Sequence, residues 1–393
     1  MNTFFVCFAS GASFLLSFLL YFHPLHQNIK ANKWLSFFVF TMGCGFISIY
    51  LTITQTTTEN SFLFKSLNCL QFLLAPSFYI SITYFVNPKK VFGKMEWLHF
   101  LPFLTYFGAE MMWNYDKESI STFPIFAINE NLSFLVRNIL PFIAIIYLAK
   151  SYNLLAKHKS NLKRIASSIN EISLEWLLQF LFILSITIVT WINDALFGLP
   201  FLTEATNFVY VVSLFFLAYF SIKQKAIFAF EEKHIKEISE IIEDKSDSDR
   251  RLKEGKNVEI PSDGSGIKEK TKRLNVEQME NLGTQLISLM EKDKLFLDNE
   301  LNLPTVAEKL GISIHEASFL INENTNDNFY NFINKYRVEE AKRLLASPKS
   351  MAQLNILGIA YNSGFNSKTT FNTTFKRIVG ISPSQYSKEQ KSS

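Results

Sequence analysis

Long apolar runs occupy the first 222 residues, and they constrain the fold because a helix that crosses a bilayer needs about 20 mostly apolar residues. The runs lack the period-2 alternation of barrel strands and contain little glycine, so helices are favoured over strands. Seven transmembrane helices are predicted, at Phe4–Phe22, Trp34–Ile53, Phe62–Val86, Trp97–Trp113, Leu132–Leu148, Leu174–Phe197 and Phe208–Ile222.

The composition of the whole chain agrees with this division. Hydrophobic residues make up 48% of the 393 residues and include forty Phe, which is too apolar for an ordinary soluble two-domain protein. Charged residues are scarce before residue 222 and frequent after it. We therefore predict an all-α protein, with a polytopic transmembrane helix bundle at 1–222 that acts as a sensor, followed by a cytoplasmic all-helical domain.

The charges of the loops predict the orientation in the membrane. Basic residues follow the first, third, fifth and seventh runs, whereas the intervening loops at 54–61, 115–131 and 198–207 are neutral or acidic. By the positive-inside rule, the N-terminus lies outside and the residues after Lys223 lie in the cytoplasm. The predicted location is the inner (cytoplasmic) membrane, with the lipid bilayer as a partner.

Three segments follow the last apolar run. Residues 223–244 carry Ile235, Ile238 and Ile242 at helical spacing, which predicts an amphipathic juxtamembrane helix. Three alternatives are open for its apolar side: it pairs with the same helix of a second chain, it lies on the membrane surface, or it packs on its own protein. The first of these alternatives predicts a homodimer. Residues 245–273 are charged, contain Pro, Gly and Ser and have almost nothing to bury, which predicts a flexible linker. Residues 274–393 begin with a second amphipathic helix and form the C-terminal domain.

The stretch from Ile359 to Tyr386 predicts a helix-turn-helix unit. Gly364 ends one apolar-periodic run, and Asn366 and Ser367 offer an N-cap for the next. In the second helix the aromatic residues Phe371 and Phe375 recur at helical spacing and must point inward. The remaining surface carries short or cationic groups that suit base edges and phosphates of double-stranded DNA: Lys368, Thr369, Asn372, Thr373, Lys376 and Arg377.

The charge around this unit has one sign. From Ala341 to Lys388 there are seven Lys or Arg residues and no Asp or Glu. Such a stretch is typical of a surface that binds a polyanion. The alternative interpretation is a basic helical hairpin used for protein contacts.

The run GFNSKTTFNTTFKRIVGISPSQY at 364–386 closely resembles the C-terminal signature of AraC-type transcriptional regulators. The resemblance covers about the last ninety residues. It implies two helix-turn-helix units, joined by a long helix, that both bind promoter DNA. Departures from the family pattern are Thr373, where Arg is frequent, Ala317, where Leu is frequent, and Ser387, where the family usually has Arg.

An internal repeat supplies the second unit. Asn302, Val306 and Gly311 match Asn355, Ile359 and Gly364 at a constant offset of 53 residues. The two units span about 302–323 and 355–378, and the run from 329 to 346 is predicted to connect them. The first recognition helix has no Lys or Arg, so its attraction to phosphate is predicted to be weaker, with base contacts from His315 and Asn322.

Polar residues inside predicted spans suggest a ligand pocket, because they are costly in a bilayer. The hypothesis is a pocket that opens to the exterior and receives a small-molecule or envelope signal, with Arg137 facing Glu110 or Asp194 when empty. The structural alternative is that the charged residues lie at headgroup level and the amides tie helices together. The predicted lining is Asn68, Gln71, Glu110, Arg137, Asn138 and Asp194.

The sequence contains none of the common motifs of enzymes or cofactor sites: no HExxH, no glycine-rich phosphate loop after a strand, and no Gly-x-Ser-x-Gly elbow. We therefore predict no enzymatic activity, no cofactor and no metal. The prediction is a membrane-embedded, sequence-specific transcription regulator that couples a membrane or extracytoplasmic signal to promoter binding. The alternative is a transporter or receptor whose cytoplasmic domain is a protein-interaction module.

Overall fold

The computed structural model describes residues 3–56, 62–115, 139–169, 172–196, 199–224 and 275–392. Every regular element in these ranges is helical, and the only β pairing among them is an isolated antiparallel bridge between Ala166 and Asn302. The predicted all-α class is therefore confirmed for the described part of the chain. The chain divides into an N-terminal unit, Met1–His158 with Leu174–Ile227, and a C-terminal unit, Lys159–Ser173 with Phe228–Ser393.

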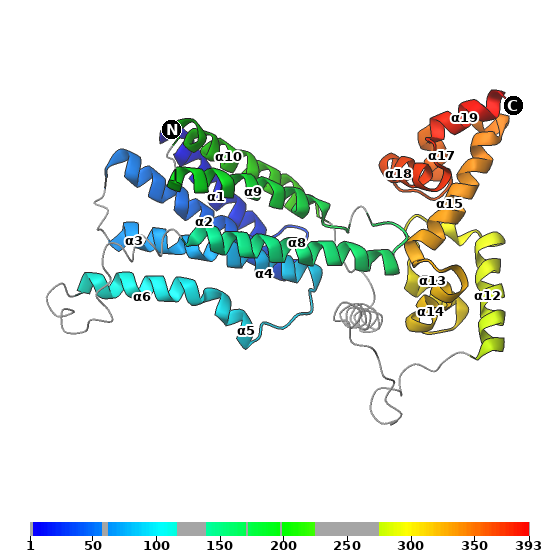
Figure 1. Ribbon diagram of the computed structural model, residues 1–393, viewed down its shortest axis with the longest axis horizontal. Helices are drawn as coiled ribbons and strands as arrows, with labels where there is room; N and C mark the ends of the chain where they lie inside the picture. Colours follow the sequence, from blue (N-terminus) through cyan, green and yellow to red (C-terminus); the bar gives the residue numbers. More distant parts are fainter. Residues whose placement is uncertain are drawn as a thin grey trace. The chain divides into compact units, whose positions relative to one another are not determined.

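The N-terminal unit is a bundle of long helices that run side by side (Figure 1). Helix α2 packs against α1 and α4, and α10 packs against α1 and α9. The helices are α1 (Thr3–Tyr21), α2 (Ile29–Thr54), α3 (Phe62–Cys69), η1 (Leu70–Leu73), α4 (Leu74–Val86), α5 (Lys94–Trp97), η2 (Leu98–Phe100), α6 (Leu101–Tyr115), α8 (Leu140–Ile165), α9 (Glu175–Leu196) and α10 (Pro200–Lys223). The last residues of α8, from Lys159 onward, belong to the C-terminal unit.

The surface of the N-terminal unit is unusually apolar. Large aromatic side chains such as Phe142, Phe182 and Phe208 are exposed, the last to 71%. Small hydroxyl residues lie inside, where Oγ of Ser17 and Oγ of Ser36 are 3.0 Å apart and each lies within hydrogen-bond distance of the other residue's carbonyl oxygen. The described part of the N-terminal unit thus has hydroxyl groups inside and large aromatic rings on its surface.

Three helical stretches in the described ranges are long and apolar enough to cross a membrane: Thr3–Tyr21, Ile29–Thr54 and Phe62–Val86. Two shorter apolar helices occur at Glu175–Thr190 and Phe208–Lys223. Helices lie in the described parts of all seven predicted runs, but the bundle of seven spans stays a prediction. The basic loop expected after Leu148 is wrong, because α8 continues as a helix through these residues to Ile165. The predicted juxtamembrane helix beyond Gln224 and the linker at 245–273 lie outside the described residues.

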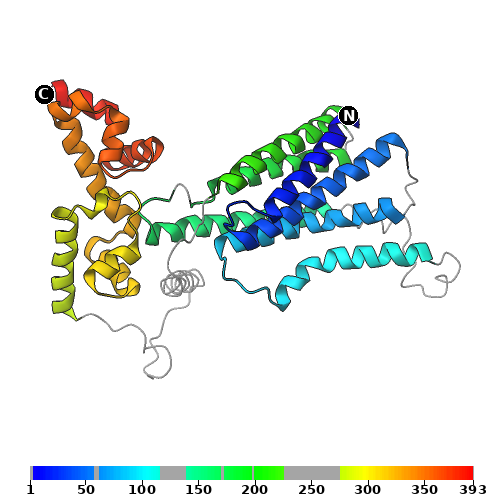
Figure 2. The same ribbon diagram turned by 180° about the vertical axis from the view of Figure 1, so that it is seen from behind.

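The C-terminal unit consists of two helical clusters at opposite ends of α15 (Figure 2). Its helices are α12 (Val276–Glu291), η5 (Leu295–Leu297), α13 (Leu303–Leu310), α14 (Ile314–Thr325), α15 (Phe329–Ala346), α16 (Pro348–Gln353), α17 (Ile356–Asn362), α18 (Lys368–Val379) and α19 (Pro383–Ser392). The predicted connecting helix is therefore confirmed, with the bounds expected from the sequence.

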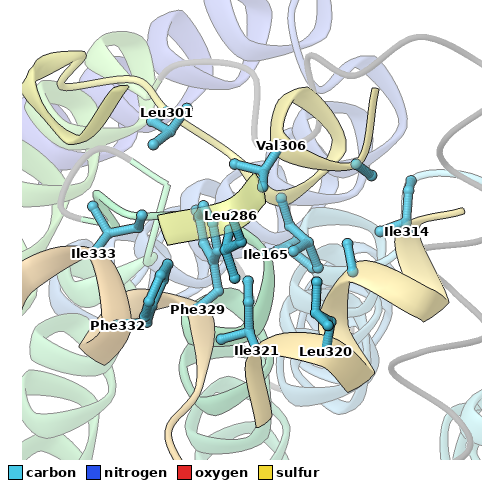
Figure 3. Packing of buried hydrophobic residues seen from close by; sticks show 14 of the residues in the cluster. Ile165, Leu286, Leu301, Val306, Ile314, Leu320, Ile321, Phe329, Phe332 and Ile333 are labelled. Carbon is cyan, nitrogen blue, oxygen red and sulfur yellow. The ribbon is translucent and has the colours of Figure 1, made fainter. Parts of the chain in front are cut away.

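Each cluster has its own hydrophobic core. The first core joins α12, α13, α14 and the start of α15 around Leu286, Val306 and Ile321 (Figure 3). The second joins the end of α15 to α17 and α18 around Ile359, Phe371 and Phe375. The inward direction expected for the two Phe residues is correct, since both are fully buried.

Candidate nucleic-acid interface

The second helix-turn-helix unit, α17 and α18, is built from local capping interactions. The side chain of Asn355 accepts a hydrogen bond from the backbone N–H of Gly358, and Ser367 accepts one from Thr370. These caps satisfy amide groups that have no partner inside a helix. The predicted cap at Ser367 is confirmed, and it places the start of α18 directly after the turn.

Gly364 is required in that turn for two reasons. Its φ angle of 88° is in the left-handed region that L side chains rarely adopt. In addition, a Cβ atom at this position would collide with the carbonyl oxygen of Phe296 and lie 3.0 Å from Nε of Arg337. The close approach ties the turn between α17 and α18 to the loop that precedes the first helix-turn-helix unit.

The first unit, α13 and α14, repeats the same turn. The backbone N–H of Ile312 donates to Ala307 O and that of Phe365 donates to Ala360 O, at 3.1 and 3.0 Å. Both bonds end a helix next to a glycine with positive φ, Gly311 in the first unit. The internal repeat inferred from the sequence is thus a repeat of structure.

The first unit is capped in the same way. Asn302 accepts from the N–H of Thr305, and Ser313 forms a capping box with Glu316. These caps fix where α13 and α14 begin.

The exposed face of α18 carries most of the residues predicted to bind DNA. Lys368, Thr369, Thr373 and Lys376 are exposed, and Asn372 is half-buried. A shallow open groove is lined by Asn372, Thr373, Lys376 and Arg377. Phe371 and Phe375 hold the helix from behind. The face therefore combines two lysine cations with short hydrogen-bonding side chains, the combination that can contact phosphates and base edges together.

Other basic groups of this region have protein partners. Arg377 donates to Oδ1 of Asn331 on α15 at 3.1 Å, so it also links α18 to the connecting helix. Lys342 and Arg343 form ion pairs with Glu339 and Glu340 of the same helix. The positive charge counted from the sequence is thus partly neutralised by Glu residues along α15. Lys368 and Lys376 are the exposed lysines of α18.

The outer face of α14 has a different character. Helix α14 contains no lysine or arginine. Asn322 is exposed and His315 is half-buried. Between them Phe319 is 49% exposed. An exposed phenyl ring on a recognition helix suits the methyl group of thymine. The helical period places Phe319 on this face, a signal that the sequence analysis did not use.

Arg337 on α15 was not singled out by the sequence analysis, although it is only 1% exposed. Its guanidinium donates to the carbonyl oxygens of Phe296, Ser167 and Asp298 and to Oγ of Ser167, at 2.7 to 3.1 Å. Burial lowers the pKa of Arg337 to about 10, so it remains charged at neutral pH. Its spacing of four from Ile333 and Ala341, both buried, is the sequence signal that places it inward.

The residues of the predicted ligand pocket are described only in part. Oδ1 of Asn68 accepts a hydrogen bond from Oγ of Ser48 at 2.7 Å, and the amide of Gln71 lies against Gly45. These contacts join α2 to α3 and η1, as the structural alternative expected for the two amides. Glu110 lies in α6 and Asp194 in α9. Arg137 and Asn138 are outside the described residues, so the pocket stays a prediction.

Residues 306–389 match a family described as helix-turn-helix domain. The chain is 30% identical over 104 residues to the HTH-type transcriptional activator RhaS of Mannheimia succiniciproducens, covering 26% of this chain and 36% of that protein. It is 34% identical over 91 residues to an uncharacterized HTH-type transcriptional regulator in the cgkA 5' region of Pseudoalteromonas carrageenovora, covering 22% of this chain and 49% of that protein.

A solved structure is also similar in sequence. The C-terminal domain of AraT, a response regulator from Geobacillus stearothermophilus, is 29% identical, with 30% of this chain and 88% of that chain covered and a TM-score of 0.24. The chain spans less than half the length of each of the two curated relatives that it matches.

Proposed function

We propose that this chain, which carries an AraC-type helix-turn-helix domain, is a membrane-embedded transcription regulator that couples a membrane or extracytoplasmic signal to promoter binding. The observation that supports DNA binding best is the exposed face of α18, with Lys368 and Lys376 beside Thr369, Asn372 and Thr373. The two curated relatives are named as transcription regulators, which supports the same function.

In this proposal α18 enters the major groove of double-stranded DNA, which is wide enough for one α-helix. Lys368 and Lys376 neutralise phosphates, while Asn372 and Thr373 contact base edges. Helix α14 enters a neighbouring stretch of the groove and contributes contacts through His315, Phe319 and Asn322. Because α14 has no Lys or Arg, most of the attraction to phosphate comes from α18.

The test measures binding of the full-length chain, in detergent or nanodiscs, to DNA from upstream of its own gene at several salt concentrations. Lys368→Ala and Lys376→Ala should each weaken binding to all sequences and reduce the salt slope by about 0.9. Thr373→Ala should instead change the preferred sequence. The control is Lys292→Ala, which removes the same charge from an exposed position after α12 and should change neither quantity.

Wild-type protein that binds no DNA above a random-sequence background would contradict the DNA-binding proposal. Wild-type affinity in the Lys368, Thr373 and Lys376 variants would contradict the assignment of α18 as the recognition helix. A protein partner captured by α18 in place of DNA would favour the alternative of an interaction module.

Membrane embedding is supported by the apolar helices and by the exposed aromatic surface of the N-terminal unit. Contiguous apolar surface of this kind aggregates in water and is stable against lipid tails. The test is labelling of single cysteines from outside the cell, in a chain whose three natural Cys are replaced. Residues in the loop at 54–61 should be labelled, and residues after Lys223 should not. The reverse pattern would place the helix-turn-helix domain away from DNA.

The signal itself is proposed to enter the predicted pocket and to change the arrangement of two chains in a homodimer. Arg137→Ala, with normal membrane insertion, should abolish the response to the stimulus without loss of basal DNA binding, because the charge that would hold an anionic group is removed. An unchanged response would remove the pocket hypothesis and leave the DNA-binding proposal intact.

A further inference from the structure

A short segment far away in the sequence completes the first helix-turn-helix core. Lys159–Ser173, named here the docking segment, contains the last turns of α8 and the residues after them and belongs to the C-terminal unit. Leu162, Ile165, Ala166 and Ile169 are all buried in the core formed by α12, α13 and α14. Figure 3 shows Ile165 among residues of the other helices, and it has no exposed surface.

Backbone pairing holds the docking segment at one defined position. Ala166 forms an antiparallel bridge with Asn302, the residue that caps α13. Next to it, the backbone N–H of Ser167 donates to Leu301 O at 3.1 Å, and its Oγ donates to the same oxygen at 2.6 Å. Apolar side chains alone tolerate small shifts, whereas these directional bonds fix the register of the segment against the start of α13.

Arg337 connects the docking segment to the second helix-turn-helix unit. Two of its four acceptors belong to Ser167, the carbonyl oxygen and Oγ, at 3.1 and 2.9 Å. The same guanidinium lies 6.0 Å from the ring centroid of Phe365, and a Cβ atom added at Gly364 would lie 3.0 Å from its Nε. A single buried cation therefore bonds to the docking segment and the loop before α13 and lies close to the turn between α17 and α18.

We propose that the docking segment is an intramolecular coupling element, whose docked position sets the geometry of both helix-turn-helix units through Arg337. Covalent continuity supplies the input, because α8 starts at Leu140 in the N-terminal unit and ends at Ile165 in the docked part. A shift of α8 removes the two Ser167 acceptors from Arg337. A buried guanidinium with unmet donors must move, and the turn at Gly364 moves with it. The inference rests on the proposed function for its effect on DNA.

The docking segment offers its own matched pair of variants. Ser167→Ala removes the Oγ that accepts from Arg337 and donates to Leu301, while Ser168→Ala removes the neighbouring hydroxyl. Oγ of Ser168 has no hydrogen-bond partner among the residues that the structure describes. The experiment measures amide hydrogen exchange and DNA affinity of the full-length chain in nanodiscs for wild type and both variants.

Ser167→Ala should speed exchange at Leu301 and Asn302 and also at Gly364 and Phe365, which lie almost two hundred residues away in sequence. It should weaken DNA binding by about twofold or more, the lower end of coupling through a contact network. Ser168→Ala should match wild type in both measurements. Unchanged exchange at Gly364 and Phe365 in the Ser167 variant would overturn the coupling, whatever happens at Leu301.

A general loss of folding is recognised separately, because it would also speed exchange throughout α12, which has no bond to Ser167 among the described residues. In that case Arg337→Lys provides the second test. Lysine keeps the positive charge, but its single ammonium group cannot donate to all four acceptors as the planar guanidinium does. The expected effect of this substitution is faster exchange at Ser167 and at Gly364 together, and an effect at only one of them contradicts the proposal. Hydrogen exchange is measured without DNA, so it tests the coupling through Arg337 even if the protein binds no DNA.

Discussion

At the scale of single residues, Arg337 decides how the C-terminal unit is assembled. A buried cation usually faces a carboxylate, but here the acceptors are three carbonyl oxygens and one hydroxyl. Carbonyl acceptors come from separate segments of backbone, so one side chain holds those segments together. Burial lowers the pKa of Arg337, yet the value of about 10 leaves the cation in place at neutral pH.

Replacing Arg337 with Met should destabilise the C-terminal unit by about 3 kcal/mol, because the buried carbonyl groups of Phe296, Ser167 and Asp298 lose a charged donor. The control is Arg343→Met on the same helix, whose side chain is 61% exposed and whose ion pair with Glu340 is expected to contribute less than about 1 kcal/mol. Native-state hydrogen exchange of the slowest amides in α15 measures both. Equal effects of the two substitutions would show that the buried network contributes little.

Two glycines with positive φ provide a second comparison at this scale. Gly364→Ala adds a Cβ that collides with Phe296 O, whereas at Gly380, with φ of 91°, a Cβ would meet no described atom within 4 Å. Gly380→Ala should cost only the strain of the left-handed conformation, about 1–2 kcal/mol. Gly364→Ala should cost clearly more and should disturb Arg337 as well. Thermal unfolding of both variants measures the difference, and equal shifts in Tm would contradict the predicted collision.

At the scale of elements, the two recognition helices share one plan but present different surfaces. Both begin at a serine cap after a glycine turn and both bury an apolar face. The outer face of α18 carries Lys368 and Lys376, while that of α14 carries an exposed Phe319 and no Lys or Arg. Phosphate attraction depends on charge, and base discrimination depends on shape and hydrogen bonds. The duplication thus allows α18 to supply most of the phosphate attraction and α14 to contribute mainly to base discrimination.

This division predicts distinct effects on DNA binding. Phe319→Ala and Asn322→Ala should relax sequence preference at some positions, by about 1–3 kcal/mol per discriminated base pair, and leave the salt slope unchanged. Selection of bound sequences from a random pool, combined with salt titrations, measures both effects. A reduced salt slope in either α14 variant would contradict the predicted weak role of α14 in phosphate binding.

At the scale of the whole molecule, the docking segment extends the C-terminal domain beyond the bounds predicted from the sequence. The domain expected from the sequence starts at 274, but its first core also uses Leu162, Ile165 and Ile169. A fragment of residues 275–393 therefore exposes apolar surface that the full chain covers. Joining residues 159–173 to the same fragment through a flexible linker should bury this apolar surface again.

The joined fragment should be more stable than the plain fragment by roughly 2–4 kcal/mol, since burying each Leu or Ile contributes about 1.5–3 kcal/mol and closing the linker costs part of it. Urea unfolding followed by circular dichroism measures the difference. A joined fragment with Ile165→Asn serves as control and should lose the gain. Equal midpoints for all three fragments would mean that the segment does not stabilise the domain.

Much of the C-terminal unit was predictable because its signals are local. Asparagine and serine caps, glycine turns and the spacing of Phe371 and Phe375 act within a few residues, so the two repeats and the connecting helix were correct to within a residue or two. The outward face of α18 follows from the same spacing. Long-range contacts carry no such signal, and neither the inward role of Arg337 nor the helix that continues to Ile165 through the basic stretch was expected.

The order of residues alone thus determined which segments of the helix-turn-helix units are helical, which of their faces are apolar, and where a basic helix follows a turn, because these depend on period and capping. Only the tertiary structure decided that Ser167 meets Arg337 across 170 residues and that the same guanidinium also bonds to the backbone before α13 and lies near Phe365. The physical reason is that a buried cation satisfies its donors wherever backbone acceptors are close in space, and closeness in space is a property of the packed chain.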